Sequence, residues 1–474
     1  MVGRKINIHK PSGLRYMIDN LRSNKNVGYT LIVIYVNVGF IHEKDKDQGL
    51  AHFCEHLMFG GTCDKKKVSD KNQESDDITL DELLKKASKY DCIESYNDIL
   101  SKISILNASL NAYTTKTHTG YHIIIPSKYV NIAFNLLFDM LHNTDITIDK
   151  INKEKNIVIE EEKRMGGNIH SVLNLKLYEM VFKNHPLGKN MLKNIKIINS
   201  YDTKLINNFI KTHYTSNNMH ISICSDLPTK IIKQKLYYYI NKYEITKTKN
   251  SDPSYFTDKL NKEIEDKKDI LKLAPKPKIY IDSDKNSENC KIQIGFRIPF
   301  GIEHKDIFIV EILNQIVGGL SGNRLFTKLR DKNSWVYRVS SDINLYRFLG
   351  IFEIETSCDI KNLYKVVSCI TKILNDIKTN GITSRELATA KNKMLFYYTN
   401  IKNETYYGIA EHNGEMMMYY DKNIPSDTDI KNTIKNMTKD DVLRMAKIVF
   451  DIENISISVS GDANKKKLLS AIDQ

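Results

Sequence analysis

The chain has 474 residues, more than one compact core usually accommodates, so we expect two or more domains. An apolar share of 41% is ordinary for a globular protein, and no segment approaches the length of a membrane span. The net charge of +13 comes from lysines spread along the whole chain, without the arginine and aromatic clusters that bind single strands, so we expect no nucleic-acid partner.

The seven cysteines are odd in number, widely scattered and never spaced as C-x-x-C, so they support neither a cysteine zinc cluster nor a disulfide framework. A reducing compartment fits them best. The N-terminus has no apolar stretch that could serve as a secretion signal, and a strand-like pattern begins almost at once. We therefore expect a cytoplasmic location, while an organelle or a virion stays open.

The first half of the chain alternates strand and helix patterns. Runs of β-branched and aromatic residues predict strands, and glycine pairs predict the ends of helices. In chain order we expect a strand over 28–39, a helix over 49–59, a strand over 120–126, a long charged helix over 147–165, and a strand over 218–226 that a helix follows.

The second half repeats this pattern after a polar stretch, 244–278, whose Lys, Asp, Asn and Pro content predicts a linker. We then expect a buried strand over 291–299, an apolar helix over 306–317 and a closing strand over 454–462. That last segment, N-I-S-I-S-V-S-G-D, is similar to N-M-H-I-S-I-C-S-D at 218–226. An internal duplication therefore predicts two homologous α+β domains, at 1–243 and 279–474.

Residues 64–95 do not fit a compact domain, because they begin with a run of lysines and acidic residues and continue into a charged helical pattern. We interpret them as an insertion that is partly mobile. It is either solvated surface or a gate beside the motif described next.

The strongest chemical signal is His52-Phe53-Cys54-Glu55-His56, inside the predicted helix 49–59. Because the two histidines are four residues apart, they lie on one helix face and can reach the same metal ion. Glu55 is close enough to act as a general base for a metal-bound water without binding the metal itself. The alternative is a pair of helix-face histidines that neighbouring residues satisfy.

A tetrahedral zinc site with an open catalytic position needs a third protein ligand. The acidic helix 147–165 offers Glu154 and Glu161, which share a face, whereas Glu160 and Glu162 point roughly 100° to either side. Periodicity favours Glu161 as the ligand and Glu154 as an outer carboxylate that orients a histidine. An exposed acidic face is equally compatible with the spacing alone.

Several blocks of the sequence carry a resemblance to a known family. They are G-L-A-H-F-C-E-H-L-M-F-G-G-T from Gly49, L-N-A-Y-T from Leu110, N-I-V-I-E-E-E-K from Asn156, H-P-L-G from His185, G-G-L-S-G-N-R-L-F from Gly318 and R-D-K-N-S-W-V-Y from Arg330. In this order they resemble the inverzincin (HxxEH) zinc metallopeptidases of the pitrilysin, insulysin and mitochondrial-processing-peptidase family, in its short, processing-peptidase-like branch. The resemblance implies two homologous domains, each a mostly antiparallel sheet with helices on one face, which together form half of a four-domain clamshell.

The resemblance also implies roles for the motif residues. His52, His56 and Glu161 would bind Zn²⁺, Glu55 would be the catalytic base, and Glu154 matches the family's carboxylate two turns earlier. The gap between His56 and Glu161 is longer than the family norm by about the size of the 64–95 insertion. Because the motifs on both sides are intact, the insertion puts substrate access in doubt rather than the site.

Substrate contacts are implied in both halves. Asn111, with Ala112 and Tyr113 on a strand edge, matches residues to which an extended peptide would add as a further strand. Arg330 and Tyr337 match an Arg and Tyr pair that acts on the scissile carbonyl, where negative charge develops. Without the family, Arg330 would be read as the partner of surface acids and Tyr337 as a packing residue.

The implied function is that of a zinc-dependent endopeptidase that hydrolyses peptides or unfolded segments inside an enclosed chamber by means of a Glu-activated, zinc-bound water. A chamber of four domains needs two chains, so we expect a homodimer in which Arg330 and Tyr337 of one chain face the zinc of the other. Two alternatives remain open. One is a beta-type subunit of a heterodimeric processing peptidase, and the other is a non-catalytic scaffold of the same fold.

Overall fold

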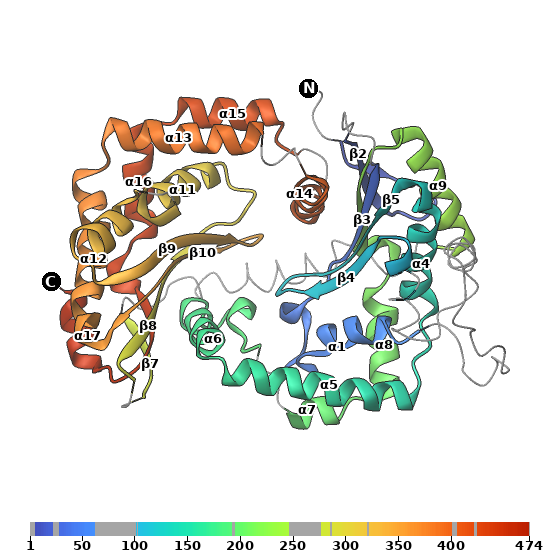
Figure 1. Ribbon diagram of the computed structural model, residues 1–474, viewed down its shortest axis with the longest axis horizontal. Helices are drawn as coiled ribbons and strands as arrows, with labels where there is room; N and C mark the ends of the chain where they lie inside the picture. Colours follow the sequence, from blue (N-terminus) through green and yellow to red (C-terminus); the bar gives the residue numbers. More distant parts are fainter. Residues whose placement is uncertain are drawn as a thin grey trace.

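The computed structural model describes residues 5–21, 28–61, 101, 103–191, 195–245, 276–284, 287–319, 322–400, 405–420 and 424–473. Two β-sheets lie on opposite sides of the molecule, one built from each half of the chain (Figure 1). The predicted insertion at 64–95 lies outside the described residues, and so does most of the predicted linker.

The sheet of the first half has six strands in the order β1-β2-β6-β3-β5-β4. Its only parallel pair among the described strands is β2 with β6, and the other neighbours are antiparallel. The strands are β1 (Asn7–Ile8), β2 (Arg15–Asn20), β3 (Tyr29–Val36), β4 (Ser109–Thr114), β5 (Thr119–Pro126) and β6 (Met219–Ser225).

The sheet of the second half has five strands in the order β7-β11-β8-β10-β9. These are β7 (Lys278–Asp282), β8 (Asn289–Ile298), β9 (Val336–Leu345), β10 (Gly350–Asp359) and β11 (Ser456–Ser460). The strands β7 and β11 are parallel, and β11, β8, β10 and β9 pair antiparallel in turn. The order and the pairing directions of these five strands match those of β2-β6-β3-β5-β4 in the first sheet. The two halves therefore have the same α+β fold, as the similarity between 218–226 and 454–462 suggested.

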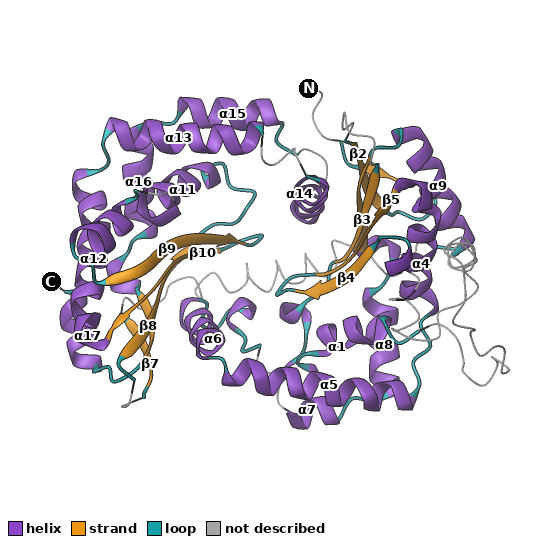
Figure 2. Ribbon diagram, in the orientation of Figure 1, coloured by secondary structure: helices purple, strands orange, loops and turns teal. Residues whose placement is uncertain are grey.

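Helices of each half cover one face of that half's own sheet (Figure 2). In the first half, alternate β3 residues such as Ile32 and Ile34 enter a core that α1, α4, α8 and α9 share. The helices of this half are α1 (Leu50–Met58), α4 (Val130–Asn143), α5 (Ile148–Gly167), α6 (Ile169–Val181), α7 (Ile195–Asn199), α8 (Thr203–His213) and α9 (Thr229–Lys242).

The second half has a matching core beneath α11, α12, α16 and α17. Its helices are α11 (Ile307–Asn314), α12 (Leu363–Asn380), α13 (Ser384–Thr399), α14 (Tyr406–Tyr419), α15 (Asp427–Asn436), α16 (Lys439–Val449) and α17 (Lys465–Ile472). Two π-helical turns, η7 (Gln315–Gly319) and η8 (Phe326–Lys332), lie between α11 and β9. No helix among the described residues is long and apolar enough to cross a bilayer.

Each half also lends one helix to the other half's sheet. Helix α6 packs on the sheet of the second half, where Leu177 and Val181 meet Ile351, and α14 packs on the first sheet, where Ile409 meets Leu31. Both helices lie between the two sheets in Figure 1. Helices were expected on one face of each sheet only. This exchange covers the second face as well and joins the halves through apolar contacts.

The predicted elements agree with the structure except at some ends. The charged helix runs from Ile148 to Gly167 and includes the glycine pair that was expected to end it, and its C-cap is Asn168. The apolar helix predicted over 306–317 stops being α-helical at Asn314 and continues as the π-helical turn η7. Gly166 and Gly167 therefore marked the end of the charged helix only approximately, because Asn168 caps it.

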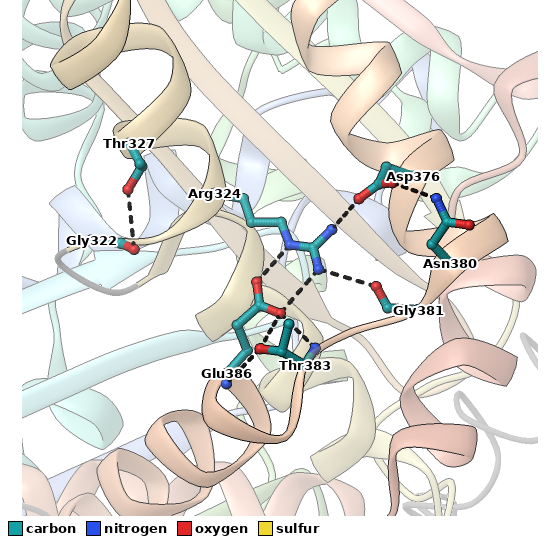
Figure 3. A network of polar contacts seen from close by, with 8 residues as sticks. All are labelled: Gly322, Arg324, Thr327, Asp376, Asn380, Gly381, Thr383 and Glu386. Atoms are coloured by element: carbon teal, nitrogen blue, oxygen red, sulfur yellow. Dashed lines mark hydrogen bonds and ion pairs between the residues drawn. The ribbon is translucent and has the colours of Figure 1, made fainter.

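The start of η8 is held by a network around Arg324 (Figure 3). The Arg324 guanidinium donates to both oxygens of Glu386, at 2.6 and 3.0 Å, and to Asp376 at 2.7 Å. Glu386 also closes a capping box with Thr383 at the start of α13. One side chain thus ties the segment that precedes Arg330 to α12 and α13.

Candidate metal centre

Helix α1 carries the H-x-x-E-H motif and begins at a buried carboxylate cap. Gly49 adopts the left-handed conformation (φ 91°). The Glu43 carboxylate accepts hydrogen bonds from the backbone N–H groups of Gly49, at 2.6 Å, and Ala51, at 2.7 Å. Because Leu50, Phe53 and other apolar side chains of α1 are buried in the core, the two histidines lie on the opposite face, toward α5.

Helix α5 presents its acids to α1 at a seven-residue interval. Its N-cap is Thr147, which accepts from the backbone of Lys150, and its apolar contacts come from Ile151 and Val158. With that face fixed, Glu154 and Glu161 both reach the histidines of α1. Glu160 instead points to solvent, where it pairs with Lys163, and Glu162 is buried.

His52, His56 and Glu161 form a cluster in which one potential ligand atom from each lies within 4.8 Å of the others. Glu161 Oε2 is 3.7 Å from His52 Nε2 and 3.4 Å from His56 Nε2. The two imidazole rings are 4.7 Å apart, at 80° to each other. The side chains converge from two helices on one point that remains partly open to solvent.

Glu154 approaches His56 from the other side of the ring, with its Oε2 3.3 Å from Nδ1. A carboxylate in this place keeps the proton on Nδ1 and leaves Nε2 free as a ligand. Burial lowers the pKa of His56, but the hydrogen bond with Glu154 and the charges of Glu161 and Glu55 outweigh it and raise the pKa above its ordinary value. A cation binding at Nε2 would displace the proton that this raised pKa retains on the ring.

Glu55 is buried, with 8% of its surface exposed, and its carboxylate accepts a hydrogen bond from the Thr114 hydroxyl. Thr114 is the last residue of β4, so the predicted base is connected to the edge strand of the sheet. A hydroxyl donor of this kind orients a carboxylate without neutralising it.

The predicted substrate strand is at the sheet edge, since β4 pairs only with β5 among the described strands. Asn111 is exposed, and its side-chain oxygen accepts from the Ala112 N–H at 2.9 Å. Tyr113 lies on the α14 side of the strand, next to Tyr35 and His118. The structure therefore gives Asn111 a local backbone contact and leaves the outer edge of β4 without a neighbouring described strand.

Arg330 and Tyr337 lie together, but apart from the cluster. The Arg330 guanidinium is 5.3 Å from the Tyr337 ring centroid, and Tyr337 is 84% exposed. Both line a cavity of about 930 Å³ against the second sheet, and no member of the His52, His56 and Glu161 cluster lines that cavity.

Two residues that shape the centre are not among those predicted from the sequence. Glu43 caps α1 from a turn six residues before Gly49, and Thr114 holds Glu55. A signal for Thr114 was available, because it lies two residues after Ala112 in the L-N-A-Y-T block and so on the same strand face. Nothing in the sequence pointed to Glu43.

The fold and the cluster define a class: a duplicated α+β protein in which, among the described residues, the first copy carries a His, His and Glu metal-type constellation and the second does not. Two family models match the chain. "Insulinase (Peptidase family M16)" matches residues 21–77 and 83–194, and "Peptidase M16 inactive domain" matches residues 202–394. The chain belongs to peptidase family M16.

Curated relatives of similar length are named zinc proteases. The chain is 24% identical over 387 residues to the uncharacterized zinc protease YmxG of Bacillus subtilis, covering 81% of each. It is 24% identical over 448 residues to an uncharacterized zinc protease of Rickettsia felis, covering 93% of each. A probable mitochondrial-processing peptidase subunit beta of Arabidopsis thaliana is 25% identical over 269 residues, which are 56% of this chain and 45% of that one.

Solved structures share the fold along nearly the whole chain. A protease from Helicobacter pylori superposes with a TM-score of 0.75 at 16% identity, covering 97% of this chain and all of that one. A chain of complex III from Candida albicans superposes with a TM-score of 0.71 at 13% identity. At such identities these similarities establish the two-domain α+β architecture and nothing further.

Proposed function

We propose that this protein is a zinc-dependent endopeptidase. The observation that carries the proposal is the convergence of His52, His56 and Glu161. In a tetrahedral site with metal–ligand bonds of 2.0–2.2 Å, ligand atoms are about 3.4 Å apart. The two distances from Glu161, 3.7 and 3.4 Å, fit this with shifts of a few tenths of an ångström.

The donor set favours zinc. Hydrolytic zinc sites commonly use two imidazole nitrogens and one carboxylate oxygen as protein ligands, and leave the fourth coordination position for water or substrate. Bound there, the metal would supply Lewis-acid activation of a water molecule and of the substrate carbonyl. Glu154, through Nδ1 of His56, is the carboxylate that would hold that imidazole in the ligating tautomer.

Glu55 is the group that would move the proton. It takes the proton from the attacking water and returns it to the amine that leaves, so hydrolysis proceeds without a covalent intermediate. Its position one residue before His56 puts it beside the cluster, and the Thr114 hydroxyl orients it. Because Thr114 belongs to the edge strand, the base and the substrate-binding strand are positioned together.

The edge of β4 would bind the substrate backbone. An extended peptide can add to this edge as a further strand, with its main-chain groups paired to β4 at Asn111, Ala112 and Tyr113. Backbone pairing supplies affinity with little dependence on side chains. The expected substrates are therefore peptides or unfolded segments selected by accessibility rather than by sequence.

Two chains would complete the site. The Arg330 and Tyr337 pair is exposed and separate from the metal cluster of its own chain, which suits a role at the centre of a partner chain. A homodimer would then enclose the chamber, with both pairs acting on the carbonyl of the substrate held by the opposite chain. Since one chain contains both halves of the site, a homodimer is favoured over a heterodimer with a separate processing subunit.

The test is the Glu55→Gln variant, measured beside the unaltered chain for bound zinc and for cleavage of a quenched peptide library. We expect stoichiometric zinc in both proteins and hydrolysis only in the unaltered chain, because glutamine cannot accept the proton. Normal cleavage by Glu55→Gln would disprove the assignment of the base. An unaltered chain that binds no zinc and cleaves nothing would instead identify a scaffold of the same fold.

A further inference from the structure

Two cysteines lie opposite each other on neighbouring strands of the second sheet, in the half of the molecule that does not contain the His52, His56 and Glu161 cluster. Cys290 on β8 and Cys358 on β10 are direct partners in the antiparallel register, and their Sγ atoms are 3.4 Å apart. Both are buried, at 1% and 5% exposure. The five described cysteines are all free thiols, so this close contact exists without a bond.

We propose that Cys290 and Cys358 form a peroxide-sensitive dithiol site, in which oxidation closes a disulfide between β8 and β10. Directly opposed residues of antiparallel strands have Cα atoms about 4.5–5.5 Å apart, which lies within the usual disulfide range of about 4.4–6.8 Å. The backbone is therefore already in place. The sulfurs need to approach by about 1.4 Å to reach a bond of about 2.05 Å.

Both cysteines are among the residues that line the cavity of about 930 Å³ that also contains Arg330 and Tyr337, so the pair lies at the wall of this cavity although little of its own surface is exposed. The charged side chains of this cavity are mostly acidic: Asp282, Asp284, Asp331 and Asp359, against Lys291 and Arg330. An acidic wall disfavours anionic oxidants such as glutathione disulfide. A small neutral peroxide fits this access route better.

The two thiols are not equivalent. The hydrogen bond with the Cys358 thiol lowers the pKa of Cys290 against the opposing effect of burial, and the same contact together with burial raises the pKa of Cys358. This direction favours Cys290 as the attacking thiol and Cys358 as the resolving thiol, and the single-serine variants below distinguish this order from the opposite one.

The chemistry balances with hydrogen peroxide as the oxidant. The Cys290 sulfur attacks one peroxide oxygen, the O–O bond breaks, and a sulfenic acid and one water form. The Cys358 sulfur then displaces the hydroxyl group from Cys290, the S–S bond forms, and the hydroxyl leaves with the Cys358 proton as a second water. Two thiols and one peroxide thus yield one disulfide and two waters.

The disulfide would constrain β10, the strand that pairs with β9 near Tyr337. The register between β10 and β9 shifts between Thr356 and Cys358, and Cys358 there pairs with Val336, the residue before Tyr337. A disulfide from Cys358 to β8 would fix β10 at this irregularity. The oxidised form is therefore expected to hold the Tyr337 end of β9 more rigidly.

The experiment uses the full-length reduced chain, treated with hydrogen peroxide, alkylated and digested with trypsin. We expect peptide 286–291, which contains Cys290, to be joined to peptide 348–361, which contains Cys358, with the loss of two hydrogen atoms. Reductant should reverse the link. In Cys358→Ser the sulfenic acid at Cys290 should persist and be trapped by dimedone, whereas in Cys290→Ser Cys358 should stay unmodified.

Cys369→Ser is the matched control, because Cys369 is also buried in the second half but is not part of the pair. This variant should form the same link as the unaltered chain. The proposal is overturned if excess peroxide leaves both thiols of the folded, unaltered chain free for alkylation after denaturation. A dimedone adduct on Cys358 rather than Cys290 would overturn the assignment of the attacking thiol.

Discussion

At the scale of single residues, two acids of α5 approach His56 from opposite sides of its ring. Glu161 is near Nε2 and Glu154 is near Nδ1. The seven-residue interval predicted that both face α1, since two helical turns return to the same face. Which of the two acids lies nearer the point of convergence depends on how α5 packs against α1. From the sequence alone, an acidic helix face exposed to solvent was an equally good interpretation.

Replacement of Glu154 by Ala tests its positioning role. Without this carboxylate the His56 ring loses the partner that fixes its tautomer, so we expect zinc affinity to fall roughly 10- to 100-fold. Competition with a chromogenic chelator measures the change. Glu160→Ala is the matched control on the same helix, because Glu160 points to solvent, and an unchanged affinity in both variants would exclude the role.

At the scale of elements, the start of α1 is fixed by the Glu43 cap, which no sequence pattern predicted. Glu43→Ala leaves the N–H groups of Gly49 and Ala51 without their buried acceptor, which costs about 3 kcal/mol of unfolding free energy. Urea titration measures the loss. Glu43→Gln keeps an acceptor oxygen and should lose less, and equal stability of the Ala variant and the unaltered chain would contradict the capping role.

The connection between β4 and β5 carries Lys116, whose charge interacts with Glu353 of the second half. Lys116 lies 4.7 Å from the Tyr178 ring of α6. Burial lowers the pKa of Lys116 to about 8, against the attraction of Glu353 on β10. In the unfolded chain the pKa of Lys116 is near 10.5, so between about pH 8 and 10.5 the unfolded chain binds more protons than the folded chain. The contribution of Lys116 to the free energy of unfolding therefore rises with pH in that window.

Lys116→Met removes this component. We expect the stability of the unaltered chain, relative to Lys116→Met, to increase between about pH 7 and about pH 10. Urea titrations of both proteins at the two pH values give the comparison. Lys361→Met, at an exposed lysine, should show no such trend, and a relative stability that falls with pH would show that the assigned direction is wrong.

At the scale of the whole molecule, the central question is whether one chain or two complete the site. If Arg330 acts on the metal centre of a partner, Glu55→Gln and Arg330→Ala chains, each inactive alone, should restore activity when mixed. A mixed dimer then has one intact site, so random pairing should recover roughly a quarter of full activity. If both groups act within one chain, the mixture stays inactive. A double variant that carries both substitutions is the control.

Short-range patterns in the amino-acid sequence were enough to predict the duplicated α+β fold and the local geometry of the motif. Those features follow from short-range periodicity: His52 and His56 share a helix face, and Glu154 and Glu161 share another, because of helical spacing alone. The strand similarity between 218–226 and 454–462 identified two copies because each copy folds by the same local rules.

The contacts between elements far apart in the chain could not be predicted in this way and became known only with the three-dimensional structure. The convergence of α1 and α5, the Glu43 cap, the bond from Thr114 to Glu55, the exchange of α6 and α14, and the contact of Cys290 with Cys358 all join residues without a fixed sequence separation. Such contacts depend on how whole surfaces pack, and packing is set by the sum of many apolar contacts rather than by any local pattern.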